Sequence, residues 1–148
     1  MTQTNQTRET LQLVNPAIEE ILTAFDIDRP PVPVELMLQR PRDGMWPEID
    51  LSEMSATFLS LYDRYAPRMS AVRLLARNIA RSEWGRSRKL DAILNDTHRV
   101  NIFARALIIP ESLLAQMELT TVDKTELSAQ FEVPEEDAQA RLEDLEYG

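Results

Sequence analysis

The sequence predicts an α+β fold: a predominantly helical single domain with one small β-sheet or hairpin. Its 148 residues are a typical length for one domain, and 43% of them are apolar, which is enough for a substantial core. Over most of the chain the apolar residues recur at three- and four-residue steps, as on one face of a helix. Between about residues 45 and 63 they alternate instead, which is typical of short strands.

The N-terminal third predicts two helices joined by a proline-rich connector. Residues 1–10 are polar and predict a flexible N-terminus, after which one domain covers residues 11–148. An apolar stripe predicts an amphipathic helix from Thr10 to about Phe25. The prolines within residues 28–33 predict an extended connector, and Val34 to Gln39 predict a short helix.

Residues 45–63 carry the predicted β element. The alternating stretches 45–51 and 56–62 predict two short strands that pair as a hairpin. Residues 52–55 between them fit a helical turn equally well, so that alternative stays open. Pro67 is expected to close the region.

The middle of the chain predicts two long helices. Ser70 is a suitable N-cap for a helix that runs to about Trp84, and Gly85 lies where a helix commonly ends. A short helix over residues 90–94 precedes an apolar helix from Val100 to Ile109. We expect four side chains to be buried where the two long helices meet: Leu75, Ile79, Phe103 and Leu107.

The C-terminal part predicts three further helices, over residues 111–117, 123–131 and 135–145. Pro134 suits the start of the last helix, because a proline in the first turn costs no hydrogen bond. Acidic residues follow it directly, and they complement the positive end of the helix dipole.

The composition excludes several classes of site. The chain has no cysteine, so a disulfide framework, a thiolate metal site and a cysteine nucleophile are excluded. His98 is the single histidine. A net charge of −9 argues against nucleic-acid and anionic-membrane binding over the whole surface. The first residues lack a signal-peptide pattern, and no long uncharged run suggests a membrane span, so we expect a cytoplasmic protein.

The charge is unevenly distributed along the chain. Residues 64–105 carry a net charge of +7, whereas residues 1–63 carry −7 and residues 111–148 carry −9. One interpretation is that the acidic arms fold against the basic centre, or that all three are separate solvated faces. The other is a basic patch for an anion or a nucleic acid, with the acidic residues held away from it.

Three segments resemble the ImmA/IrrE family of zinc metallopeptidases. VNIFARALIIPE, from Val100 to Glu111, resembles the family's A-N-x-F-A-x-x-L-L-M-P segment, and LSAQFEVPEEDAQARL, from residue 127 to residue 142, resembles its closing L-A-x-x-F-x-V-S-x-x-A-x-x-x-R-L. PPVPVE at residues 30–35 is similar to the entry P-P-V-x-V. Their order and spacing agree with the family over roughly residues 20–145, which implies a zincin-like ImmA/IrrE scaffold.

The family's catalytic motif is degenerate in this chain. The family carries A-H-E-x-x-H, in which the histidines bind zinc and the glutamate activates water. The matching frame is ARNIAR, with Arg77 and Arg81 at the histidine positions and Asn78 at the glutamate position. The neighbourhood of the third ligand, residues 96–99, contains no glutamate. A guanidinium has no lone pair for a metal, so we expect no enzyme activity, no bound metal and no cofactor.

The same helix presents a candidate anion or partner groove, for which the sequence selects Arg73, Arg77, Asn78, Arg81 and His98. The three arginines lie four residues apart and share one face, and the resemblance places two of them where zinc would bind. The favoured interpretation is a structural clamp, in which Arg77 and Arg81 pair with carboxylates such as Glu111, Glu132 and Glu135. The alternatives are an anion pocket and a solvated face.

The sequence therefore predicts a non-catalytic ImmA/IrrE-like domain, a pseudo-peptidase, with a regulatory protein-interaction role. The resemblance implies a protein partner of the helix-turn-helix repressor kind, or a role in a stress response. Nucleic acid is a disfavoured partner, a membrane is not expected, and homo-oligomerisation stays open. The alternative function is an anion- or nucleic-acid-binding module that uses the stripe of Arg73, Arg77 and Arg81.

Overall fold

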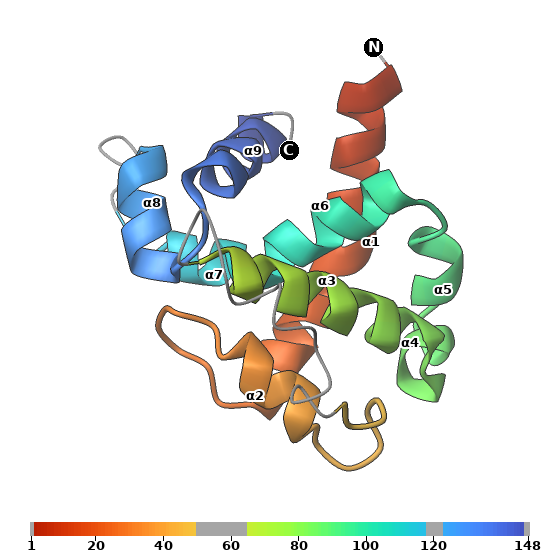
Figure 1. The fold of residues 1–148 in the computed structure, drawn as a ribbon. Coiled ribbons are helices and arrows are strands. Elements are labelled where there is room, and N and C mark those ends of the chain that lie inside the picture. Colours follow the sequence, from red (N-terminus) through yellow and green to blue (C-terminus); the bar gives the residue numbers. More distant parts are fainter. Residues whose placement is uncertain (1, 50–64, 118–122, 147–148) are drawn as a thin grey trace.

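The structure, a computed structural model, describes residues 2–49, 65–117 and 123–146 (Figure 1). Helices account for the regular structure of these ranges. They are α1 (Thr2–Ala24), α2 (Val34–Gln39), α3 (Ala66–Arg81), α4 (Glu83–Ser87), α5 (Leu90–Ile93), α6 (Thr97–Ile108), α7 (Glu111–Leu114), α8 (Lys124–Phe131) and α9 (Glu135–Glu146). Within the same ranges, no helix combines the length and the apolar content needed to cross a bilayer.

The predicted α+β fold class is wrong, because none of the described residues belongs to a strand. Residues 45–49, the described part of the predicted hairpin, run as irregular chain beside α2, and residues 50–63 lie outside the described residues. The indole Nε1 of Trp46 donates to Met37 O at 2.9 Å, and the backbone N of Ile49 donates to Leu38 O at 2.9 Å. The end of α2 thus accepts one side-chain and one backbone hydrogen bond from this segment, and Pro47 has no N–H for a sheet ladder.

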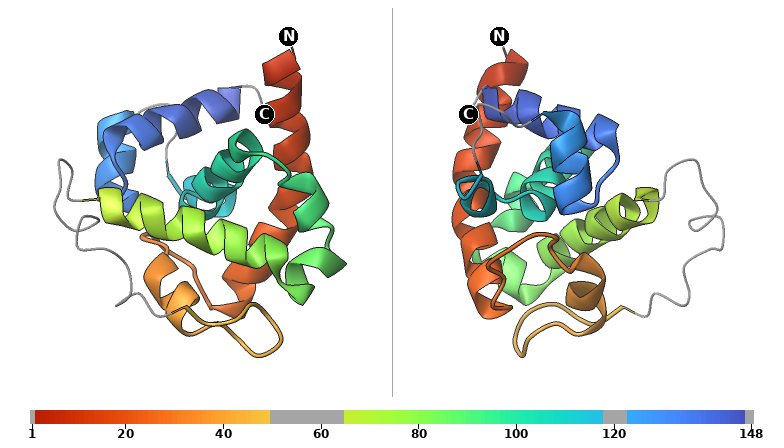
Figure 2. Two further views of the ribbon diagram at one scale, coloured as in Figure 1. Left: turned by 45° about the vertical axis from the view of Figure 1, so that its right-hand side comes forward. Right: turned by 90° about the vertical axis from the view of Figure 1, so that its left-hand side faces the viewer.

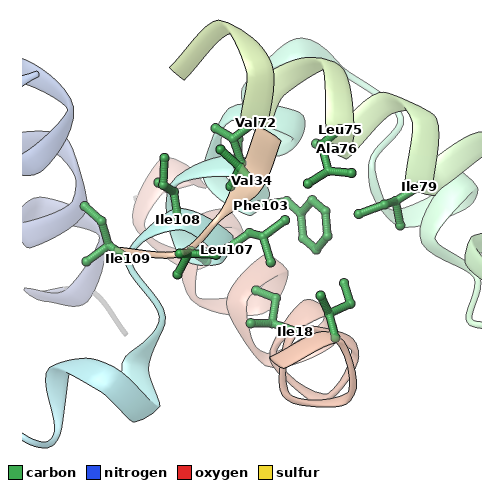
Figure 3. Packing of buried hydrophobic residues seen from close by; sticks show 14 of the residues in the cluster. Ile18, Val34, Val72, Leu75, Ala76, Ile79, Phe103, Leu107, Ile108 and Ile109 are labelled. Atoms are coloured by element: carbon green, nitrogen blue, oxygen red, sulfur yellow. The ribbon is translucent and has the colours of Figure 1, made fainter. Parts of the chain in front are cut away.

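Helix α6 lies at the centre of the fold, where it packs against α3, α1 and α9. Figures 1 and 2 show α3 crossing one side of α6, with α1 on another. The four predicted core residues, Leu75, Ile79, Phe103 and Leu107, are all 0% exposed, so this prediction is confirmed. Figure 3 shows the ring of Phe103 facing Ala76 and Ile79 of α3.

Helix α1 begins earlier than its apolar stripe predicts. It begins at Thr2 rather than near Thr10, and it contains Pro16 on its exposed side. The side chain of Thr10 is fully buried, and its Oγ1 donates to Gln6 O at 2.7 Å, one helical turn back. A polar residue whose hydroxyl bonds its own helix can continue the buried face, which the apolar pattern does not reveal. The flexibility predicted for residues 1–10 stays a prediction.

Helix α3 also begins before its predicted N-cap, Ser70. Pro67 lies in its first turn instead of closing the preceding region, since a proline there removes no intrahelical bond. Gly85 does not end a helix but lies within α4, where an added Cβ would clash with the carbonyl oxygen of Ile79. Ser82 separates the two helices, and its Oγ accepts a bond from Gly85 N at 3.0 Å.

The C-terminal helices form close to their predicted bounds. Asp123 caps α8, with its Oδ1 accepting from Glu126 N at 2.9 Å. Helices α8 and α9 pack together, and α9 also packs against α6. Arg141 of α9 is fully buried at that contact, where its Nε donates to Ile109 O at 3.0 Å.

Among the described residues, four ion pairs join the basic centre of the chain to its acidic arms. Arg68 pairs with Glu35 at 2.8 Å, and Arg88 pairs with Glu20 at 2.7 Å. On the C-terminal side, two further arginines pair with α9: Arg73 with Asp137 at 3.3 Å and Arg105 with Asp144 at 2.8 Å. These pairs confirm the interpretation in which the acidic arms fold against the basic centre.

Candidate functional site

A groove of about 330 Å³ lies between the C-terminal half of α3 and the connection from α5 to α6. We call it the arginine groove. Its lining residues are Arg77, Ala80, Arg81, Asp91, Leu94, Asn95, Asp96, Thr97 and Val100. Figure 1 shows the elements that carry these residues, with α5 near the end of α3 that leads into α4.

Two arginines form one wall of the groove. Arg77 and Arg81 lie four residues apart on α3, so their side chains leave the same face of the helix. Both residues are exposed, and neither side chain has an ion pair or hydrogen bond with the described residues. Both guanidinium groups are permanently charged and have no carboxylate partner among the described residues, so they can bind an anionic group.

The predicted clamp is wrong for Arg77 and Arg81, since in the described part of the chain neither meets Glu111, Glu132 or Glu135. Two of these glutamates accept hydrogen bonds from other residues. Glu111 accepts a bond from Asn15 at 3.1 Å, and the backbone oxygen of Glu132 accepts one from Arg68 at 2.9 Å. The carboxylates that do pair with arginine belong to other residues, because the fold brings α9 against Arg73 and Arg105 instead.

Two carboxylates also line the groove. Asp96 is the N-cap of α6, and its Oδ1 accepts a bond from Arg99 N at 2.8 Å. Asp91 lies in the first turn of α5. Both residues are exposed, and within the described ranges neither forms an ion pair with Arg77 or Arg81. The groove therefore holds opposite charges that do not neutralise each other directly.

The other three predicted site residues do not line the groove. Arg73 is held by Asp137, and His98 is exposed on the first turn of α6 without being part of the lining. Asn78 is 9% exposed, and its Nδ2 donates to Pro47 O at 2.8 Å. The Asn78 amide thus ties α3 to the segment that follows α2.

The clamp that the sequence missed is made by Arg68, whose side chain is 12% exposed. Its Nη1 donates to Glu35 Oε1 at 2.8 Å, its Nη2 to Val32 O at 2.8 Å, and its Nε to Glu132 O at 2.9 Å. One guanidinium therefore joins the PPVPVE segment to the end of α8. An arginine in the first turn of a helix gives no sequence signal for this role, because all of its partners are distant in the chain.

Arg141 is a second arginine whose role was not predicted. Removal from water lowers its pKa to about 10, while the nearby carboxylates of Asp144 and Glu111 act in the opposite direction. Its Nη1 and Nη2 have no hydrogen-bond partner among the described residues. Arg141 stands at the arginine of the family's closing R-L pair, and that resemblance is the one sequence signal that marks it.

The groove supplies charge but no ligand set for a metal. Across the residues that the structure describes, no three histidine or acidic side chains come together in a way that could hold an ion. The groove is lined instead by two guanidinium groups, two carboxylates and a few apolar side chains.

Comparison of the chain with protein-family models, with curated proteins and with solved structures finds no match. The ImmA/IrrE resemblance therefore stays a prediction that rests on the three motifs and their spacing.

Proposed function

We propose that this chain is a non-catalytic ImmA/IrrE-like domain with a regulatory protein-interaction role, and that the arginine groove contacts its partner. One observation carries the proposal. Arg77 and Arg81, at the family's histidine positions, line the same groove as Asp96 and Thr97, from the neighbourhood of the family's third ligand. Residues that the family motif requires to be close thus lie close together, although they are distant in the sequence.

The groove residues favour binding over catalysis. An arginine guanidinium stays protonated at every physiological pH and cannot bind a cation. Asn78 cannot accept a proton from water, and its amide is already bonded to Pro47 O at 2.8 Å. A groove with two unpaired guanidinium groups is suited to an anionic group of a ligand.

The charges of the groove favour a protein partner over a nucleic acid. A nucleic-acid surface requires several cations along a run of phosphates. Here Asp91 and Asp96 line the groove beside the two arginines, and Arg73 is already paired with Asp137. An anion- or nucleic-acid-binding module is the second candidate, because Arg77 and Arg81 themselves are unpaired in the described structure.

The proposed partner is a regulatory protein, for which the resemblance suggests a helix-turn-helix repressor. The proposed setting is the cytoplasm, which a chain without cysteine suits. In this proposal the partner is bound and not cleaved.

Affinity capture with charge-reversed variants tests the proposal. The wild-type chain, Arg77→Glu/Arg81→Glu and the control Arg29→Glu/Arg40→Glu are immobilised and exposed to a lysate of the source organism. The control makes the same change of charge at exposed arginines outside the groove. We expect one intact protein to be retained by the wild type and the control and lost from the groove variant.

Three results would contradict the proposal. Equal retention by all three chains would show that the groove does not contact the partner. Near-stoichiometric zinc in the purified protein, together with metal-dependent cleavage of the retained protein, would end the non-catalytic assignment. Retention of nucleic acid alone, sensitive to salt, would favour the second candidate.

A further inference from the structure

We infer that the arginine groove receives one acidic and one basic side chain from the same partner segment. The acidic side chain binds Arg77 and Arg81, and the basic one binds Asp91 and Asp96. This inference rests on the proposed function and names the chemistry of the partner surface.

The first argument is that the groove carries opposite charges on different elements. Arg77 and Arg81 belong to one helix, whereas Asp91 and Asp96 belong to the α5–α6 region, and all four residues are exposed. No ion pair joins the arginines to the aspartates within the described structure. A ligand with a single negative charge would pair with the arginines, but the same charge would be repelled by the aspartates. A ligand that carries both charges is complementary to the whole groove.

The second argument comes from the floor and the size of the groove. Ala80, Leu94 and Val100 line it and are only 6–7% exposed, so they offer a small apolar surface beside the charged residues. Long charged side chains lay their aliphatic stems on such a surface and keep their charged ends in contact with polar groups. A volume of about 330 Å³ is at the small end of ligand pockets. It suits two side chains rather than a folded element.

A helix of the partner, lying outside the groove, can insert an acidic and a basic side chain together. A glutamate followed four residues later by a lysine presents both charges on one face of a helix. We therefore expect the partner segment to be a helix that carries an acidic and a basic residue one turn apart.

Titration with four synthetic helical peptides tests this inference. The peptides are alanine-based and differ at two positions four residues apart, which hold Glu and Lys, Glu and Gln, Gln and Lys, or Gln and Gln. They are added to the isotope-labelled full chain at low salt, and the amide signals of the groove residues are followed by NMR. We expect the Glu/Lys peptide to bind roughly three- to tenfold more tightly than the Glu/Gln peptide, because each exposed ion pair contributes modestly.

A variant of the acidic wall makes the test specific. Asp91→Asn/Asp96→Asn removes both carboxylates, while asparagine at position 96 preserves the helix cap. We expect this variant to bind the Glu/Lys and Glu/Gln peptides equally. The control Asp43→Asn/Glu48→Gln removes the same charge from exposed residues outside the groove and should retain the difference.

Each remaining outcome overturns the inference and separates it from the proposed function. Equal binding of the Glu/Lys and Glu/Gln peptides to the wild type would show that the groove takes an acidic side chain alone. If no peptide shifts the groove signals, the inference fails as well. In both cases, loss of the captured protein from Arg77→Glu/Arg81→Glu would leave the proposed function standing, whereas unchanged capture would remove it too.

Discussion

Replacement of Phe103 by alanine tests whether the fold is centred on the contact between α3 and α6. Phe103 is 0% exposed, and its neighbours in the core include Ile79 and Leu107 (Figure 3). Removal of a fully buried phenylalanine side chain from a packed core costs about 3–5 kcal/mol, which combines the lost transfer free energy with the cavity left behind. For a chain of this size, each kcal/mol corresponds to roughly 2–4 °C, so the melting temperature should fall by about 10 °C.

Urea unfolding followed by circular dichroism measures the loss. The control is Leu13→Ala, because Leu13 is 46% exposed and its truncation should change the free energy of unfolding by less than about 0.5 kcal/mol. If Phe103→Ala cost less than about 1 kcal/mol, the side chain would not be buried as described, and the central packing would be refuted.

Three further predictions concern the charged residues. Arg77→Met and Arg81→Met should each change the free energy of unfolding by less than about 0.5 kcal/mol in urea titrations, because neither side chain has a partner in the described structure; a loss above about 1 kcal/mol would show that they clamp the fold. Asp96→Ala should cost about 1 kcal/mol by the same assay and Asp96→Asn almost nothing, since Asp96 caps α6 and asparagine caps equally well; equal losses would contradict the capping role. Hydrogen bonds from Arg88 hold the pKa of Glu20 below its ordinary value, so the stabilisation from this pair is present above the unfolded pKa and is lost as pH falls through the folded pKa. NMR titration of Glu20 should show that lowered midpoint, and Arg88→Gln should raise it; a midpoint that does not move would refute the assignment.

Local signals in the sequence predict most of the helices. Val34–Gln39 forms the predicted helix, and α8 and α9 lie close to their predicted bounds, because caps, prolines and apolar spacing act within a few residues. The four core residues were predictable for the same reason, since each lies on the apolar stripe of its helix.

The predicted hairpin failed because alternation of apolar residues does not identify the partner that they pack against. Trp46 is buried, its indole donates to Met37 O of α2, and its ring stacks on Phe25, contacts that depend on tertiary structure. The sequence does not predict the start of α3, because Pro67 suggests a boundary although a proline in a first turn is compatible with a helix.

Only the arginine side of the groove could be predicted from the sequence. The motif frame led to Arg77 and Arg81, but Asp91 was not selected because nothing in a short connecting segment marks its residues as groove-lining. The pairing of the arginines was missed for a related reason. Arg68 and Arg105 pair with carboxylates 33 and 39 residues away, and no local pattern encodes which acidic residue each one meets.

Site-specific cross-linking from position 81 tests the central claim most directly. A photoreactive amino acid replaces Arg81 in the full chain, which is expressed in its source organism, illuminated and analysed by mass spectrometry. A matched substitution at Arg40, exposed and outside the groove, serves as the control. We expect position 81, and not position 40, to cross-link to one regulatory protein of intact length. Three results would contradict a non-catalytic protein-binding role for the arginine groove. They are cross-links to nucleic acid alone, cross-links to a protein that is cleaved in the presence of metal, and equal cross-linking from both positions.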